Sequence, residues 1–355
     1  AEDAVQEALI EAFRVWPEDP PRDAKGWLVT TAWRRFLDAT RSEASRRGRE
    51  ERLERAPAPG PAAEHDDTLQ LYFLCAHPSL TPAAAVALTL RAVGGLTTRQ
   101  IAEAYLVPET TMGQRISRAK RTVADVGLEQ PGDVGTVLRI LYLAFNEGYS
   151  GNVDLAAEAI RLTRQLAARI DHEEVAGLLA LMLLHHARRA ARTRPDGSLI
   201  PLAAQDRSRW DTALIAEGVE ILQTALARDR LGEFQAQAAI AALHADARTV
   251  DETDWVQIVE WYDELIAITD SPVARLNRAV AVGEADGPRA GLAALNDLDP
   301  ELPRHRAATA YLHERDGDLA AAARAYADAA HRASNQAERD HLTRQAARLN
   351  RQLRD

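Results

Sequence analysis

The stretch LTTRQIAEAYLVPETTMGQRISRAKR, residues 96–121, contains two short helical patterns that meet at Val107-Pro108. Thr97 and Gln100 have the spacing of a capping box, which marks the start of the first helix. Proline disfavours helical backbone in the residue before it but fits the first turn of a helix, so the second helix should begin near Pro108. Two helices joined this tightly predict a helix-turn-helix.

The faces of these two helices differ in chemistry. The first helix should bury Ile101, Ala104 and Tyr105. The apolar stripe of the second helix consists of Met112, Ile116, Ala119 and Val123. The polar candidates for contact with DNA are Thr110, Thr111, Gln114, Arg115, Arg118 and Arg121. Major-groove binding needs an anchored face and a face with amide and guanidinium groups, which favours DNA binding over an ordinary basic surface helix.

The composition limits the class of protein. The chain has 355 residues, of which 46% are hydrophobic and 27% are charged, as expected for a globular protein of two or three domains. It contains one cysteine and no run resembling a membrane span or a signal peptide, so we expect a cytoplasmic protein. Most of the formal charge of −10 lies in residues 127–355, which leaves two basic islands, 34–49 and 91–121.

The first basic island follows a helical pattern that contains Trp27 and Trp33. Aromatic side chains interleaved with arginines suit unstacked bases and the DNA backbone, although a single tryptophan is more often part of a core. The candidates here are Trp33, Arg34, Arg35, Asp38 and Arg41. Residues 51–66 are rich in proline, alanine and glycine and form a linker between domains 1–50 and 67–126.

The chain begins inside a helical pattern, residues 1–16, without an initiator methionine or an N-cap. We therefore expect a further segment before Ala1. The polar face of this pattern carries Asp3, Gln6 and Glu7.

Residues 127–355 form a third part that consists of successive helical patterns without an alternating strand pattern. The segment GDLAAAARAYADAA, residues 317–330, places Gly317, Ala322, Tyr326 and Ala329 as in the second half of a tetratricopeptide repeat, and residues 276–295 look like a weaker copy. We expect a helical-repeat array, with a generic helical bundle as the alternative. The fold class is all-α.

Together, these segments resemble a known bacterial family. AEDAVQEALIEAF and GWLVTTAWRRFLDATR look like the promoter −10 domain of extracytoplasmic-function sigma factors, which belong to the sigma-70 family. LTLRAVGGLTTRQIAEAYLVPETTMGQRISRAKR looks like their −35 domain. LYLAFNEGYSGN and TDWVQIVEWYDEL resemble the subgroup with a long tetratricopeptide-like extension. The resemblance covers nearly the whole chain.

The resemblance implies roles for the candidate residues. Asp3, Gln6 and Glu7 match positions that touch the clamp helices of core RNA polymerase, and the −35 domain lies near its flap. The first basic island matches the helix beside the −10 element, and the loop 17–26 matches the place where a flipped base is captured. Gln114, Arg115 and Arg118 match the helix that enters the −35 major groove. The extension would regulate the factor and bind a protein or peptide, without contact with a membrane.

Other polar clusters in the sequence favour structural roles. His185 and His186 should end a helix, Asp254 should cap one before a buried Trp255, and Gly148 should terminate one. Cys75 should be a small buried hydrophobic residue. We find no catalytic set, metal cluster or nucleotide fingerprint, so we expect neither an enzyme nor a cofactor.

The sequence therefore predicts a transcription initiation factor that binds core RNA polymerase and recognises −10 and −35 promoter elements. One alternative is a stand-alone helix-turn-helix regulator with a ligand-sensing or dimerising repeat domain. Another is a repeat-domain adaptor whose DNA-binding motifs are vestigial. The dependence of specific DNA binding on core polymerase distinguishes the first two.

Overall fold

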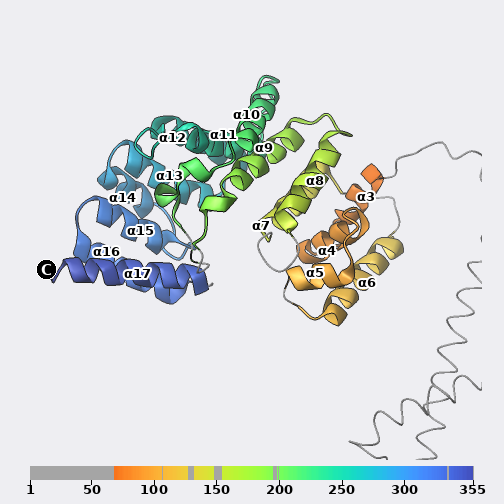
Figure 1. The fold of residues 1–355 in the computed structure, drawn as a ribbon, viewed down its shortest axis with the longest axis horizontal. Coiled ribbons are helices and arrows are strands. Elements are labelled where there is room, and N and C mark those ends of the chain that lie inside the picture. Colours follow the sequence, from red (N-terminus) through yellow and green to blue (C-terminus); the bar gives the residue numbers. More distant parts are fainter. Residues whose placement is uncertain are drawn as a thin grey trace, which may run out of the picture. The chain divides into compact units, whose positions relative to one another are not determined.

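The computed structural model describes residues 68–105, 107–126, 132–147, 154–194, 198, 200–333 and 336–354. The chain divides into two compact units, residues 1–66 and 67–355, and the described residues belong to the second (Figure 1). Its secondary structure is helical in all the elements described, which confirms the all-α prediction.

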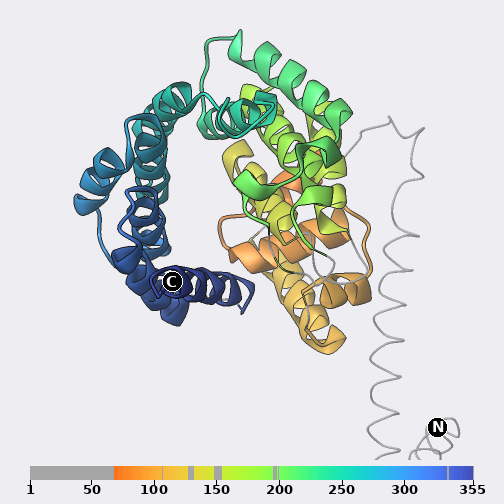
Figure 2. The ribbon, with the colours of Figure 1, turned by 60° about the vertical axis from the view of Figure 1, so that its left-hand side comes forward.

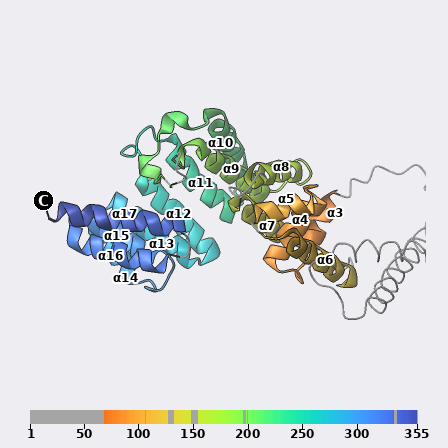
Figure 3. The ribbon, with the colours of Figure 1, turned by 60° about the horizontal axis from the view of Figure 1, so that its bottom comes forward.

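The first four described helices are α3 (Thr68–Cys75), α4 (Pro82–Ala92), α5 (Thr98–Ala104) and α6 (Glu109–Val126). The start of α4 follows the sequence signal, because the Thr81 side chain accepts a hydrogen bond from the Ala84 amide and Pro82 occupies the first turn. α4 packs on α6, and α5 packs on both. These helices lie together at one end of the described unit (Figure 3).

The next helices are α7 (Val134–Asn146), α8 (Leu155–Ala167), α9 (Glu173–Ala187), α10 (Thr212–Leu226) and α11 (Glu233–Asp246). Short 3-10 helices at Arg189–Ala191, Leu202–Ala204 and Arg207–Arg209 connect α9 with α10. α9 is buried along most of its length and contacts α7, α8, α10 and α11. His185 and His186 lie in its last turn, as predicted.

The remaining helices are α12 (Trp255–Thr269), α13 (Pro272–Ala285), α14 (Pro288–Asn296), α15 (His305–Arg315), α16 (Leu319–Arg332) and α17 (Gln336–Gln352). Each packs on the next in the chain, and α13 also contacts α15 (Figure 2). Ala322, Tyr326 and Ala329 are buried, as the repeat pattern predicts, and Gly317 adopts a φ of 85° at the turn before α16. Successive helices therefore stack as in a helical-repeat array.

One hydrophobic core connects the helix-turn-helix with the helices that follow it. This cluster begins at Tyr72 of α3, includes Leu90 of α4 and Met112 of α6, and continues to Phe234 and Ala241 of α11. Smaller clusters follow along α11–α17. The helix-turn-helix is thus part of the same packed unit as the first half of the extension.

Candidate nucleic-acid interface

The helix α5 begins with the capping box that the sequence predicts. The Thr97 hydroxyl accepts a hydrogen bond from the Gln100 amide at 3.2 Å, and the Gln100 side chain accepts one from the Thr97 amide at 2.9 Å. Ile101 and Ala104 are buried and Tyr105 is half-buried. These contacts fix the start and the buried side of the first helix of the motif.

The second helix, α6, is anchored by the predicted apolar stripe. Met112, Ile116 and Ala119 are buried, and Val123 is half-buried against a smaller cluster that contains Cys75. Gly113 faces α5 without crowding, since a Cβ at this position would lie at an ordinary contact distance, 3.7 Å, from Cγ2 of Thr98. The packing leaves the opposite side of α6 facing outward.

The outward side of α6 carries the polar candidates. Arg115 is half-buried, and the exposed ones are Thr110, Thr111, Gln114, Arg118 and Arg121. Arg118 donates a hydrogen bond of 3.4 Å to the Gln114 side chain, so these two residues share one face. Arg115 lies close enough to Tyr105 to lower its pKa, although burial and Glu147 together raise that pKa. The structure therefore brings all six candidates together on one helix.

The charge of this face is not neutralised within the described residues. None of the ion pairs found there involves Arg115, Arg118, Lys120 or Arg121. On α5, by contrast, Arg99 pairs with Glu103 at 2.9 Å. A helix with exposed guanidinium and amide groups and a fixed opposite face has the chemistry of a major-groove reader.

Contacts from the extension hold the helices around the motif. The Tyr72 hydroxyl of α3 donates a 2.7 Å hydrogen bond to the carbonyl of Leu162 in α8. Arg161 of α8 donates a 3.4 Å bond to the carbonyl of Gly94, just after α4, and pairs with Glu158 at 2.6 Å. These residues do not occupy the outward side of α6, which stays open to solvent.

The remaining site predictions have different outcomes. The −10 candidates, the polymerase-contact candidates Asp3, Gln6 and Glu7, and Gly148 lie outside the described residues. Asp254 caps α12, as predicted, whereas Trp255, predicted to be buried, is half-buried. Cys75 is buried, as predicted, and its burial raises the thiol pKa to about 11.

None of the described helices is both long and apolar enough to cross a membrane. Among the described residues, no group of three or more His, Cys, Asp or Glu side chains is arranged to hold a metal ion.

Comparisons with known proteins match three segments of the chain. The sigma-70 region 2 family matches residues 1–46, and the sigma-70 region 4 family matches residues 70–123. A family of unknown function (DUF6596) matches residues 133–226. An uncharacterized protein of Rhizobium meliloti (strain 1021) is 41% identical over 333 residues, which cover 85% of this chain and 78% of the relative. No solved structure gives a significant match.

Proposed function

The chain belongs to the sigma-70 family of transcription initiation factors, and we propose that its helix-turn-helix recognises the promoter −35 element through the outward side of α6. Factors of this family bind core RNA polymerase and promoter DNA and are not enzymes. The observation that carries the proposal is the exposed, unneutralised polar face of α6 opposite a buried stripe. Gln114, Arg115 and Arg118 would contact base edges, and Arg121 would contact phosphate.

We further propose the division of labour along the chain. Residues 1–50 would contact the −10 element and the clamp helices, residues 51–66 would link them to the −35 domain, and residues 67–126 would contact the polymerase flap and DNA. A single helix-turn-helix binds DNA weakly, but polymerase holds both domains at a high effective concentration. Specificity would then come from α6, while most of the affinity comes from polymerase.

The extension, residues 127–355, would assist this function as a scaffold and could also receive a regulatory partner. Two observations favour the scaffold role of the extension. The extension shares a core with α3 and α4, and it leaves the outward side of α6 exposed. Gln114, Arg118 and Arg121 of α6 are exposed, so the described part of the acidic extension does not cover them.

Run-off transcription with purified core polymerase tests the DNA-binding role. The variant Arg115→Ala/Arg118→Ala should still bind core polymerase but lose most promoter-specific transcript. Arg324→Ala is a matched control, because Arg324 is an exposed arginine of α16 with no ion pair among the described residues. Unchanged transcription by the double variant would refute DNA recognition by α6.

Point variants at the junction test the scaffold role without removing the extension. Tyr72→Phe and Arg161→Ala each delete a contact between the extension and α3 or the end of α4. A scaffold predicts less transcript from these variants, because the helix-turn-helix is held less firmly. An increase in transcript would instead indicate that the extension inhibits the factor.

A further inference from the structure

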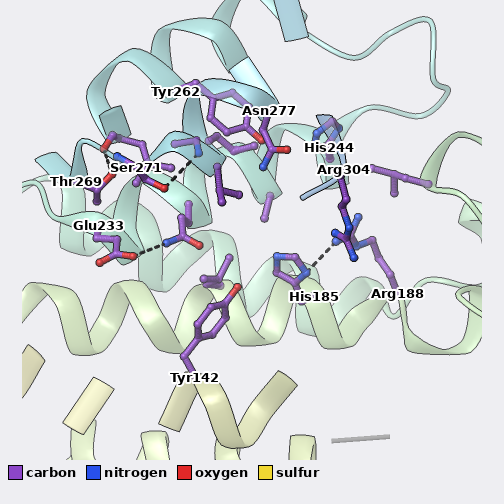
Figure 4. Close-up of a pocket in the computed structure, with 18 residues that line it drawn as sticks. Tyr142, His185, Arg188, Glu233, His244, Tyr262, Thr269, Ser271, Asn277 and Arg304 are labelled. Carbon is purple, nitrogen blue, oxygen red and sulfur yellow. Dashed lines mark hydrogen bonds between the residues drawn. The ribbon is translucent and has the colours of Figure 1, made fainter. Parts of the chain in front are cut away.

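A cavity of about 610 Å³ lies in the extension, lined by α9, α11, α12 and α13 (Figure 4). Tyr142 of α7, Leu202 of the second 3-10 helix and Arg304, just before α15, also line it. Its volume is in the range of small-molecule sites, roughly 300–1,000 Å³. The lining comes from helices on both sides of the junction between the main core and the smaller clusters of α11–α17.

One end of the cavity is basic. Figure 4 shows His185, Arg188, His244 and Arg304 near one another at this end. The Arg188 guanidinium donates a 3.1 Å hydrogen bond to Nδ1 of His185. Burial lowers the pKa of His185 to about 3 and that of His244 to about 4, so both imidazoles are neutral near pH 7. The positive charge at this end therefore comes from the arginines.

The neighbours of the two histidines also indicate a positive charge at the basic end of the cavity. After burial, the groups that lower the pKa of His185 are Arg188, Arg192 and His244. For His244 they are Arg188 and Arg207. The charged neighbours that shift these two pKa values are arginines, which favour an anion beside Arg188. Glu338 offsets part of the charge of Arg304.

Arg304 is held at the cavity by its backbone and by an ion pair. Its φ of 67° lies in the left-handed region, which is uncommon for a residue with a Cβ. Its Nε donates a 3.1 Å hydrogen bond to Glu338 of α17. That hydrogen bond uses the Nε atom of the guanidinium. Arg304 also lines the cavity.

The wall above the basic end carries the side chain of Tyr262. Burial raises the pKa of Tyr262 to about 12, and no hydrogen bond joins its hydroxyl to another described residue. Figure 4 shows Asn277 beside Tyr262. The residue Tyr262 is half-buried and lines the cavity, so its hydroxyl is available to donate a hydrogen bond to a ligand there.

The rest of the cavity restricts the shape of the ligand. Leu181, Ile240 and Leu265 supply an apolar surface. The other end contains Glu233, whose carboxylate accepts a 3.1 Å hydrogen bond from Gln237. A ligand with negative charge at both ends would meet repulsion there, so a single anionic group at the basic end fits best.

We propose that this cavity binds a small organic anion. Its carboxylate or phosphate lies between Arg188 and Arg304, with Tyr262 as a hydrogen-bond donor, and its apolar body packs on Leu181 and Leu265. Binding joins α9 and α11 to α12, α13 and the loop before α15, so an occupied site stabilises the extension as a whole. The site belongs to the extension and does not depend on the role proposed for α6.

Isothermal titration calorimetry of the full chain tests this site with three related probes: indole-3-acetate, 3-indoxyl phosphate and the neutral indole-3-acetamide. At least one anion should bind saturably with one site per chain, about tenfold or more tighter than the amide, because charged hydrogen bonds are the stronger ones. The tighter of the two anions identifies the anionic group as carboxylate or phosphate.

Two variants locate the binding. Tyr262→Phe removes only an unpaired hydroxyl, so the fold should persist, and Arg304→Gln changes an exposed side chain; each should weaken anion binding severalfold to about tenfold. Arg289→Gln is the control, since Arg289 is an exposed arginine that pairs with Asp316 away from the cavity. Equal affinity for anion and amide, no saturable binding of either anion at millimolar concentration, or binding unchanged in both cavity variants would each overturn the proposal.

Discussion

The hydroxyl of Tyr72, on α3, donates a 2.7 Å hydrogen bond to the main-chain carbonyl of Leu162, on α8. Tyr72 is 1% exposed, and burial raises its pKa. The bond therefore joins the region 4 segment to the extension in an environment that water does not reach. The helix α6 is positioned by this shared core in addition to its own small hydrophobic stripe.

Tyr72→Phe should lower the free energy of unfolding by about 1 kcal/mol, the typical net contribution of a buried hydrogen bond. Urea unfolding of the full chain, followed by circular dichroism, measures this change. Tyr262→Phe is the matched control, because its hydroxyl has no partner among the described residues, and it should cost little or nothing. If the two variants behave alike, the Tyr72–Leu162 bond does not stabilise the junction.

The two kinds of contact proposed for α6 predict different DNA-binding behaviour. Arg121→Ala removes a phosphate contact, so the factor bound to core polymerase should lose affinity for all promoter sequences alike. The slope of log affinity against log salt should also fall by about one. Fluorescence anisotropy with labelled promoter DNA at several salt concentrations gives both quantities. An unchanged slope would show that Arg121 does not contact phosphate.

Gln114→Ala should instead alter base preference. Loss of a bidentate base contact costs about 1–3 kcal/mol for the preferred sequence and much less for the others. Competition between −35 variants that differ by one base pair measures this preference, with Arg324→Ala as the control. A uniform loss across all sequences would assign Gln114 to the backbone.

The sequence predicted the helix-turn-helix well because its signals are local. The Thr97 capping box, the break at Val107-Pro108 and the apolar spacing on α6 each depend on residues within a few positions of one another. Side-chain periodicity decides which face is buried, so the exposure of Gln114 and Arg118 followed from the pattern. The same holds for Tyr326, whose burial follows from the repeat spacing.

The cavity could not be predicted because its residues are distant in the sequence. Tyr142, Arg188, Tyr262 and Arg304 meet only through the packing of segments that extend from α7 to the loop before α15.

The N-terminus of α11 also depends on a residue that is distant in the sequence. Its N-cap, Gly232, has no side chain, and the orphan amides of Phe234 and Gln235 are bound by Glu174 of α9 at 2.8 and 3.0 Å. A pattern of neighbouring residues in the sequence cannot predict such a long-range cap.

Alanine substitutions at two helical glycines should change stability in opposite directions, depending on how closely another helix packs on the glycine. A Cβ at Gly291 of α14 would lie 2.8 Å from the carbonyl oxygen of Ala279 and 2.8 Å from Cα of Gly283, both backbone atoms of α13. Gly291→Ala should therefore force α13 and α14 apart and lower stability by about 1–3 kcal/mol.

Gly113→Ala is the matched variant at an uncrowded position. Its Cβ would meet only Cγ2 of Thr98, at 3.7 Å, which is an ordinary contact. Alanine is the better helix former, so this variant should raise stability by about 0.5–1 kcal/mol. Thermal unfolding of both variants compares the two sites, and a stabilising Gly291→Ala would contradict the close approach of α13 and α14.

The buried histidines of the cavity predict how stability depends on pH. The pKa values of His185 and His244 fall from 6.5 to about 3 and about 4 in the folded chain. Below pH 6.5 these two histidines therefore bind protons in the unfolded chain but stay neutral in the folded chain. Stability from these groups is complete above pH 6.5 and is lost as the pH falls towards 4, by up to about 1.4 kcal/mol per pH unit for each histidine.

Unfolding measured between pH 7.5 and 5 tests this dependence, because carboxylates titrate mainly below that window. Besides burial, the neighbours that lower these two pKa values are Arg188, Arg192 and His244 for His185, and Arg188 and Arg207 for His244. His185→Gln/His244→Gln should flatten the loss of stability on acidification, whereas His331→Gln, at an exposed position of α16, should leave it unchanged. A double variant as acid-sensitive as the parent would place the sensitivity elsewhere in the chain.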